Sequence, residues 1–360
     1  MTESIFKVLD ASNQQDAEIW LELWSQWPRR EVYAHPEYLK LYHNDLSKGF
    51  CAVFSSNNGH VLYPFMLRDI GKEPYGSIGV SPLYDIITPY GYGGPFAWGF
   101  ENKEAPGHIF WEHFRNWVLE NNIVSEVVKF SVFGENLAPY EGAKKEVMRN
   151  IVVDLTAPED DLWMRFEHKV RKNVKKAARA GVSVVTDSMG AGLSDFLTIY
   201  RSTLDRRNAK ENYYFTSDYF KSLHCNLPGE FMYFHALHDG KPVSTELVLV
   251  SSESVYSFLG GTYSDKFNLA PNDMLKHEII KWGVKNHKKY FVLGGGYEPD
   301  DGIYRYKKSF APAGSVPFFV GSRVFNGALY DKLIQRRKVA EREKGNDWDP
   351  IPDFVPEYRS

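Results

Sequence analysis

The stretch from residue 255 to 310 constrains the fold most, because it reads as strand, loop, helix and strand in that order. An aromatic and β-branched run at 255–262, VYSFLGGT, ends in two glycines and has the pattern of a strand. Pro271 precedes the segment MLKHEIIKWGVKNHKK at 274–289, in which apolar residues recur at helical spacing. The run KYFVLGGG at 289–296 then predicts a short buried strand closed by glycines.

This arrangement predicts a ligand-binding site at the start of the helix. The free backbone N–H groups and the dipole of a helix N-terminus attract anions. Asn272 lies at this start and is therefore predicted to bind substrate. The following segment, 297–312, carries acids, tyrosines and lysines between glycines and prolines, so we expect it to lie outside the core.

Two halves of the chain repeat one plan, which predicts an internal duplication. Residues 16–133 and 159–325 both run through helices, an antiparallel hairpin, a glycine-rich loop, an amphipathic helix and a strand. Because each copy has the length of an ordinary domain, the sequence predicts an α/β fold with mixed sheets and domains at 1–150 and 151–330. Residues 331–360 are expected to form a charged helix and a loose tail.

The composition indicates a soluble protein of the cytoplasm. The chain has 360 residues, a formal net charge of −3 and two cysteines, Cys51 and Cys225, without metal or redox spacing. Its start lacks the basic and apolar regions of a signal peptide, and no run approaches the roughly 18 apolar residues of a membrane span, so no stable membrane insertion is expected. The acidic balance argues against wholesale binding of nucleic acid but is compatible with a local basic patch.

Several reaction classes lack their motifs in this sequence. It contains no compact histidine, cysteine and aspartate grouping with metal-ligand spacing, no G-x-S-x-G elbow and no P-loop. Metallohydrolase, serine hydrolase and NTPase activities are therefore disfavoured, and no metal site is expected. Transfer of an acyl group to an amine requires a held donor, a deprotonated amine and hydrogen-bond donors or charge for the oxyanion.

The end of the second half carries a family resemblance. Three glycines at 294–296 followed by YKKSF at 306–310 resemble the G-G…F-K-x-x-F ending of the Fem-type peptidyltransferases, a branch of the GNAT acyltransferase superfamily. Three earlier stretches resemble the family's first-domain Gly-Pro turn, its basic helix and its Tyr-x-x-Thr-x-x-Arg helix. They are residues 87–96, 161–184 and 200–220.

The resemblance implies two tandem GNAT-like domains and amide formation by acyl transfer. The donor would be an acyl-CoA or an aminoacyl-tRNA. The acceptor would be an amino group of a cell-envelope precursor, such as an amino sugar or peptide carried on a nucleotide or glycan. The sequence leaves open the donor, the acceptor and the oligomeric state.

Three residues are expected to serve the chemistry. Lys307 matches the lysine of the family ending, where an ammonium binds phosphate or stabilises a carbonyl oxyanion; a solvated surface lysine is the alternative. The site is expected in a cleft between the two domains, and Tyr256 is expected to aim its hydroxyl into it as an acid or orienting group, unless it is an ordinary half-buried strand tyrosine. Glu246 is expected to take a proton from the amine through water if burial raises its pKa.

Arginines and tyrosines near 206 are expected to hold the substrate. Arg206 resembles the family arginine that clamps a nucleotide pyrophosphate, a role that suits a guanidinium because its fork binds phosphate oxygens two at a time. The adjacent Arg207 is its rival, and a helix-surface arginine is the alternative for both. Tyr213 and Tyr214 are expected either to stack on a base or sugar or to pack.

A helix expected from about Glu159 to Ala180 has a strongly basic face, which includes Lys172 and Lys176. This face is interpreted in three ways: as solvated surface, as a landing surface for a nucleotide-linked precursor or the acceptor end of tRNA, or as a contact for anionic lipid. The acidic overall balance weakens the lipid interpretation.

Two departures from the family pattern bear on the substrate. The donor loop at 266–271 reads KFNLAP and lacks the glycines of the R/Q-x-x-G-x-G/A loop that cradles the coenzyme A pyrophosphate. The residues FAW at 96–98 follow Pro95, where peptidoglycan members carry an acidic residue. The sequence favours an N-acyltransferase and keeps one alternative, a non-catalytic GNAT-like protein that binds tRNA or an anionic glycan through the basic helix.

Overall fold

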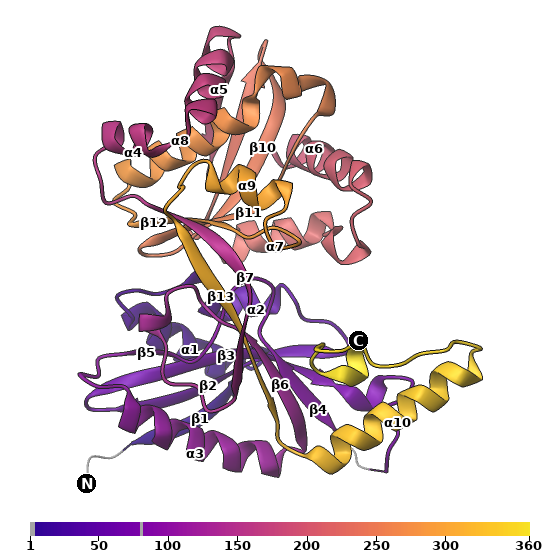
Figure 1. The fold of residues 1–360 in the computed structure, drawn as a ribbon. Coiled ribbons are helices and arrows are strands. Elements are labelled where there is room, and N and C mark those ends of the chain that lie inside the picture. Colours follow the sequence, from indigo (N-terminus) through magenta and orange to yellow (C-terminus); the bar gives the residue numbers. More distant parts are fainter. Residues whose placement is uncertain (1–3, 80–81) are drawn as a thin grey trace. The chain divides into compact units, whose positions relative to one another are not determined.

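The computed structural model describes residues 4–79 and 82–360, which form two compact units. Both units are α/β, as predicted, with helices packed on mixed sheets (Figure 1). No helix in the described part of the chain is long and apolar enough to cross a membrane. Unit 1 comprises the chain up to Trp27, Tyr33–Val147 and Phe318–Ser360, and unit 2 comprises Pro28–Val32 and Met148–Pro317.

The sheet of unit 1 has the strand order β1-β2-β3-β4-β6-β13, with β5 added to β3. Neighbours are antiparallel except β4 and β6, which are parallel. Its strands are β1 (Ile5–Asp10), β2 (Ser47–Ser56), β3 (Gly59–Asp69), β4 (Tyr84–Ile87), β5 (Phe96–Trp98), β6 (Ile123–Lys129) and β13 (Ser315–Val324). Its helices are α1 (Gln14–Gln26), α2 (Pro36–Lys40), α3 (Glu104–Glu120) and α10 (Gly327–Glu343).

The sheet of unit 2 has the strand order β7-β12-β11-β10-β9-β8. Here β11 and β12 form the parallel pair, and the remaining neighbours are antiparallel. Its strands are β7 (Ala143–Asp154), β8 (Ser183–Asp187), β9 (Phe231–His238), β10 (Lys241–Val250), β11 (Ser254–Thr262) and β12 (Tyr290–Gly294). Its helices are α4 (Glu159–Arg165), α5 (His168–Arg179), α6 (Leu193–Arg206), α7 (Ser217–Asn226), α8 (Pro271–Lys285) and α9 (Gly302–Lys308).

The two sheets repeat one set of pairings, which confirms the predicted duplication. In each, a first strand lies against an antiparallel hairpin, a third strand follows, and one helix leads to a parallel neighbour. The strand next to the parallel pair comes, in each sheet, from the other half of the chain. β13 follows β12 in the chain but pairs with β6, whereas β7 follows β6 but pairs with β12. The sequence did not predict this exchange, because the residues of one strand do not specify which strand it pairs with.

Helices α6 and α8 cover opposite faces of the unit 2 sheet (Figure 1). α8 packs on β9 and β10 with Leu275 and Ile279 fully buried, and α6 packs on β10 and β11. Gly261 lets α6 approach closely, since a Cβ there would lie 2.5 Å from Thr203 Oγ1. Burying one Leu or Ile side chain contributes about 1.5–3 kcal/mol, so the predicted apolar face holds α8 against the sheet.

The helix predicted at 159–180 is not continuous. It is divided into α4 and α5, because Phe166 and Glu167 are extended, with ψ angles of 146° and 149°. Phe166 turns into the core, and Arg171 donates to the carbonyl oxygens of Met164 and Phe166 at the end of α4. A guanidinium therefore satisfies the carbonyl groups that the helix break leaves free.

Two segments predicted to lie outside the core are packed into it. In the segment 297–312, Tyr304 and Phe310 belong to the core of unit 2. Of the charged helix and loose tail predicted at 331–360, the helix is present as part of α10, but the tail after it is not loose: it belongs to unit 1, and Tyr358 is fully buried. In both segments charged residues surround single aromatic residues that are buried. A prediction based on polarity therefore did not identify either segment as packed.

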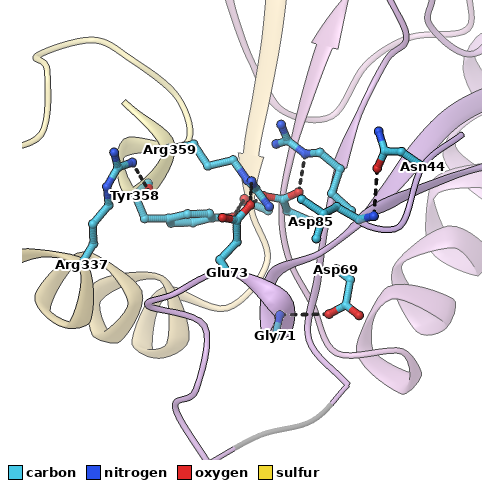
Figure 2. A network of polar contacts seen from close by, with 11 residues as sticks. Asn44, Asp69, Gly71, Glu73, Asp85, Arg337, Tyr358 and Arg359 are labelled. Carbon is cyan, nitrogen blue, oxygen red and sulfur yellow. Dashed lines mark hydrogen bonds and ion pairs between the residues drawn. The ribbon is translucent and has the colours of Figure 1, made fainter. Parts of the chain in front are cut away.

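An ion network holds the C-terminal segment on unit 1 (Figure 2). The buried Asp85 carboxylate accepts hydrogen bonds from Arg68 Nε at 2.7 Å, Arg359 Nε at 2.6 Å and the Tyr358 hydroxyl at 3.0 Å. Arg359 also pairs with Glu73, with 2.6 Å between the guanidinium NH1 and Oε1. Because a buried carboxylate needs its partners, the last turn of the chain is part of the packed unit.

Replacement of Arg359 by alanine is expected to lower the free energy of unfolding by about 3 kcal/mol, since it leaves the buried Asp85 carboxylate short of a partner. Urea unfolding measures the loss. The matched control is Glu343→Ala at an exposed position of α10, which should change stability by less than about 0.5 kcal/mol. An Arg359→Ala protein as stable as the wild type would show that aromatic packing alone holds the segment.

Candidate functional site

The separation of β11 from β12 defines the candidate site in unit 2. The parallel pair is joined only from Ser254 opposite Tyr290 to Tyr256 opposite Val292, whereas β11 continues to Thr262. Beyond the joined residues, side chains from other elements can enter between the strands. A place where neighbouring parallel strands part is a recurrent position for ligands in α/β folds.

The corresponding strands of unit 1 stay joined. The Thr88 amide donates to the Val127 carbonyl oxygen at 3.2 Å, and the Gly93 amide donates to the Lys129 carbonyl oxygen at 2.8 Å. Backbone hydrogen bonds thus occupy the place at which unit 2 opens. We therefore place the candidate site in unit 2.

One face of α8 carries two buried charged residues. Asp273, Lys276 and Ile280 are spaced i, i+3 and i+7 on one helix face, and all three are buried. Lys276 Nζ donates to Glu246 Oε1 on β10 at 2.5 Å and to Ser257 Oγ on β11 at 2.9 Å. The buried ammonium is therefore compensated both in charge and in hydrogen bonding.

Lys307 lies at the end of α9, near Lys276. Its Nζ donates to the carbonyl oxygen of Gly295, just past the end of β12, at 2.6 Å. Burial, followed by the nearby charge of Lys276, lowers the pKa of Lys307 from 10.5 to about 8. Asp301 caps the start of α9, since its carboxylate accepts from the Tyr304 amide at 2.7 Å. Lys307 is thus a positioned amine that exchanges its proton near neutral pH.

Tyr306, next to Lys307 on α9, and Asp273, in the first turn of α8, are two further polar groups of unit 2. The Tyr306 hydroxyl is buried and has no hydrogen-bond partner within residues 4–79 and 82–360. Burial raises the pKa of Tyr306, and the charges of Asp273 and Glu246 raise it further. Asp273 accepts a hydrogen bond from Asn173 Nδ2 at 3.2 Å, and burial raises the pKa of its carboxyl group. A buried hydroxyl without a partner is costly, so the Tyr306 hydroxyl has room in its hydrogen bonding for one further group.

Lys307 and Glu246, both predicted to act in catalysis, therefore lie around Lys276. Asn272, predicted to bind substrate, is half-buried at the start of α8 beside Asp273. Among the side chains that the structure describes, no three His, Cys, Asp or Glu residues are grouped so that they could hold a metal ion.

The orientation predicted for Tyr256 is wrong. Its hydroxyl donates to Glu31 Oε2 at 2.7 Å, and the whole residue is buried. Side chains alternate along a strand, so Tyr256 faces away from the side on which Ser257 meets Lys276. Tyr256 therefore anchors the segment Pro28–Val32 to unit 2.

The predicted binding residues of α6 lie toward the far end of β11. Arg206 NH1 donates to the carbonyl oxygen of Thr262 at 3.1 Å, and the guanidinium lies 5.0 Å from the ring centroid of Phe267. Arg207 is exposed where α6 ends, and the exposed Tyr214 donates its hydroxyl to a carboxylate of α6 at 2.8 Å. Arg206 alone of the three is in contact with the loop that leads into α8.

Lys172 and Lys176 are exposed on α5. The apolar stripe of this helix, which includes Val170, Val174 and Ala177, is buried in the core of unit 2. The two lysines thus belong to a solvent-facing basic surface, separate from the buried cluster around Lys276.

The loop before α8 does not have the form of a pyrophosphate cradle. Ser264–Leu269 forms a short 3-10 helix, Ala270 has a φ of +53°, and Pro271 at the first position of α8 has no N–H to donate. Asp273 then places a carboxylate in the first turn. A carboxylate at a helix start already occupies the favourable field that would hold an anion. These residues do not fit the pyrophosphate of coenzyme A at this position.

Sequence reasoning missed Ser257, Asp273, Lys276 and Tyr306. One signal was available, since Asp273 and Lys276 stand within a helix whose apolar period predicted burial, and charged residues are rarely buried unless they are paired. Ser257 and Tyr306 carried no comparable signal, because their surroundings come from segments distant in the chain.

A cavity of 380 Å³ lies elsewhere in unit 2. It lies among β7, α4 and the loop at 310–314, and charged side chains of Asp154 and Arg165 contribute to its lining. The atoms Arg165 NH1 and Asp154 Oδ2 are 3.9 Å apart. None of the residues predicted to act or to bind lines this cavity, so it is separate from the cluster around Lys276.

Comparisons with known proteins agree with this architecture. Residues 164–308 match the family model described as "Acetyltransferase (GNAT) domain". The solved structure of FemX is similar with a TM-score of 0.66 and 12% identity, covering 88% of this chain and 97% of that chain. A search of curated protein sequences found no match.

Two further solved structures share the fold. One is the C-terminal domain of a candidate lysylphosphatidylglycerol synthetase from Agrobacterium fabrum, with a TM-score of 0.52 and 14% identity, covering 88% of this chain and 94% of that chain. The other is a conserved protein of unknown function from Bacteroides thetaiotaomicron, with a TM-score of 0.55 and 10% identity, covering 89% of this chain and 99% of that chain. The family match and the shared fold confirm the predicted resemblance to Fem-type GNAT proteins.

Glu31, the partner of Tyr256, makes the stability of unit 2 depend on pH. Burial raises the pKa of Glu31 from 4.5 to about 7. Between these two values the folded chain keeps a proton on Glu31 that the unfolded chain has released. The free energy of unfolding that Glu31 contributes therefore falls as the pH rises through this window.

Glu31→Gln is expected to gain stability over the wild type by about 2 to 3 kcal/mol between about pH 5 and pH 8, because the amide cannot ionise. Urea titrations at several pH values measure this difference. Glu211→Gln, at an exposed position of unit 2, is the control and should show no such trend. A stability difference for Glu31→Gln that stays constant with pH would contradict the argument.

Proposed function

We propose that this chain, whose residues 164–308 match the GNAT acetyltransferase family, is an N-acyltransferase that forms an amide on an amino group. The acceptor would belong to a cell-envelope precursor, either an amino sugar or a peptide carried on a nucleotide or glycan. The donor would be an acyl thioester such as acyl-CoA or the ester of an aminoacyl-tRNA. The observation that carries the proposal is the buried cluster of Glu246, Lys276, Ser257 and Lys307 where β11 and β12 part.

The reaction needs charge stabilisation where the carbonyl oxygen becomes negative. The amine nitrogen attacks the carbonyl carbon, the C–N bond forms, and the bond from carbon to the donor's sulfur or oxygen breaks. The nitrogen loses one proton, and the departing sulfur or oxygen, which carries away the electron pair of its bond, gains one, so that a free thiol or hydroxyl is released. An ammonium held in a buried site stabilises the intermediate oxyanion strongly, because water does not screen it.

Lys307 supplies this ammonium in the proposal. Its bond to the carbonyl oxygen of Gly295 fixes one of its three N–H donors, which leaves the others for the acyl oxygen. Lys276 adds a second positive charge that its bonds to Glu246 and Ser257 hold in place. Because Glu246 is already bonded to Lys276, it positions that ammonium and is a poorer candidate for the proton acceptor.

The choice of donor follows from the start of α8. The GNAT family match supports an acyl-CoA, while the likeness to FemX and the Fem-type motifs support an aminoacyl ester. Pro271 and Asp273 disfavour a pyrophosphate at the helix start, which favours the aminoacyl ester. Arg206, beside the loop at Thr262, remains the proposed contact for a phosphate group of either substrate.

A second candidate function is a non-catalytic protein that binds tRNA or an anionic glycan. The exposed basic face of α5 and the altered donor loop support it. Such a protein would bind its anionic ligand through Lys172 and Lys176 without transferring an acyl group. Binding without turnover in the assay below would therefore favour this candidate.

Lys307→Ala is expected to lower kcat for acyl transfer by about 100-fold or more, as removal of an oxyanion donor does in other enzymes. Mass spectrometry of an amine mixture incubated with acyl-CoAs or charged tRNA measures the transfer. Lys308→Ala is the matched control, because this neighbouring lysine lies over the ring of Tyr304 and not in the cluster. Unchanged turnover in Lys307→Ala would show that Lys307 does not stabilise the oxyanion.

The pH profile gives an independent check of the same role. Lys307 has a pKa of about 8, so the rate should fall as the pH rises through this value and the charge is lost. Lys307→Arg keeps its charge and should move this fall to a higher pH. A fall at the same pH in both proteins would contradict charge stabilisation by Lys307.

A further inference from the structure

The cavity of 380 Å³ among β7, α4 and the loop at 310–314 takes no part in the proposed reaction. Three of the side chains that line it are apolar and buried, namely Val153 of β7, Leu162 of α4 and Phe310 after α9. Protein interiors contain few spaces larger than a water molecule. Since an apolar cavity of about 150 Å³ suffices to bind benzene, this one has room for a larger apolar group.

The loop at 311–314 forms one wall and is held on β7 by its backbone. The Val152 amide donates to the carbonyl oxygen of Gly314 at 2.8 Å, and the Gly314 amide donates to that of Ala311 at 2.9 Å. A Cβ at Gly314 would lie 2.2 Å from the Val152 carbonyl oxygen, so glycine is required for this approach. Hydrogen-bonded backbone therefore bounds the cavity on this side, and such fixed walls are usual for small-molecule sites.

Two opposite charges lie at the opening of the cavity. Asp154 and Arg165 both line it, and each side chain is 52% exposed. Asp154 Oδ2 and a guanidinium nitrogen of Arg165 are 3.9 Å apart, which is too far for a hydrogen bond. Thr156 donates its hydroxyl at 2.7 Å and its amide at 2.9 Å to the other carboxylate oxygen, Oδ1. Within residues 4–79 and 82–360, Oδ2 and the Arg165 guanidinium thus make no hydrogen bond.

Both groups are charged at neutral pH. The hydrogen bonds from the Thr156 hydroxyl and amide lower the pKa of Asp154, and an arginine guanidinium stays protonated. Because the pair is half exposed and its atoms are not in hydrogen-bond contact, its mutual attraction is weak. The opening therefore offers a negative acceptor and a positive donor side by side, next to an apolar space.

A ligand that matches this site needs an ammonium, a carboxylate and an apolar group. An α-amino acid carries the two charges on one carbon atom, which suits side-chain groups 3.9 Å apart. A fatty acid would bring its carboxylate close to Asp154, and an alkylamine would bring its ammonium close to Arg165.

We propose that this cavity binds a free α-amino acid with a large apolar side chain. Its ammonium would bind Asp154, its carboxylate would bind Arg165, and its side chain would lie against the apolar walls. The inference goes beyond the proposed function, because none of the residues in the cluster around Lys276 lines the cavity.

The experiment removes one group of the ligand at a time. Calorimetric titration of the full chain at pH 7 uses L-phenylalanine and three analogues. They are 3-phenylpropanoate without the ammonium, 2-phenylethylamine without the carboxylate and glycine without the apolar group. L-Phenylalanine should bind about tenfold more tightly than each analogue, because each lacks either a charge-assisted hydrogen bond or the buried apolar surface.

Charge-removing variants assign each half of this preference. Asp154→Asn should abolish the preference over 3-phenylpropanoate and keep that over 2-phenylethylamine, whereas Arg165→Gln should do the reverse. Asp160→Asn and Arg179→Gln, at exposed positions that do not line the cavity, are the matched controls and should keep both preferences. Thermal unfolding of each variant verifies that it is folded.

The inference would be overturned if the wild type did not bind L-phenylalanine, or if it bound 3-phenylpropanoate or 2-phenylethylamine equally well. Preferences that survive in folded Asp154→Asn and Arg165→Gln would also overturn it. Lys307→Ala separates this site from the reaction, since it should bind L-phenylalanine as the wild type does, whatever its turnover. Loss of binding in a folded Lys307→Ala protein would show that the amino acid binds at the cluster around Lys276 and not in this cavity.

Discussion

The buried contact of Lys276 with Glu246 and Ser257 is the interaction on which the rest of this site depends. It joins α8, β10 and β11 through one ammonium, and removing either charge alone would leave the other buried without an opposite charge, at a cost of about 3 to 5 kcal/mol. The same positive charge contributes to the lowered pKa of Lys307. The ion pair of Lys276 with Glu246 and the lowered pKa of Lys307 therefore both follow from the position of Lys276.

The two duplicated halves of the chain differ at this place. Both sheets use the same pairings, and both contain a parallel pair joined by a helix. In unit 1 backbone hydrogen bonds from Thr88 and Gly93 continue the contact between β4 and β6, which leaves no place for side chains between them. In unit 2, β11 and β12 part. Side-chain hydrogen bonds from Lys276 on α8 are found there in place of backbone hydrogen bonds. The strands of one copy thus stay joined by backbone hydrogen bonds, and those of the other part beside a buried polar cluster.

Local patterns predicted the elements well, whereas contacts between distant segments escaped them. The sequence was sufficient for the duplicated α/β plan, for the stretch at 255–296 and for the placement of Lys307 and Glu246 near that stretch. It failed for the side chain of Tyr256, because a strand tyrosine fits either face of a sheet and only the partner Glu31, far away in the sequence, decides between them. It failed likewise for the C-terminal segment, since Asp85 meets Arg359 across most of the chain. Propensity and periodicity describe neighbours in sequence, and the missed contacts are long-range ion pairs and hydrogen bonds.

The central claim is that a buried cluster tunes Lys307 to stabilise a developing negative charge. The most direct measurement is the pKa of this one amine, obtained by NMR titration of ¹⁵N-lysine-labelled protein, with Lys307→Arg to assign the signal. The account predicts a value near 8 that rises when Lys276 is replaced by methionine, because a neighbouring positive charge is removed. A value at the ordinary 10.5 of a solvated lysine, unaffected by Lys276→Met, would contradict it.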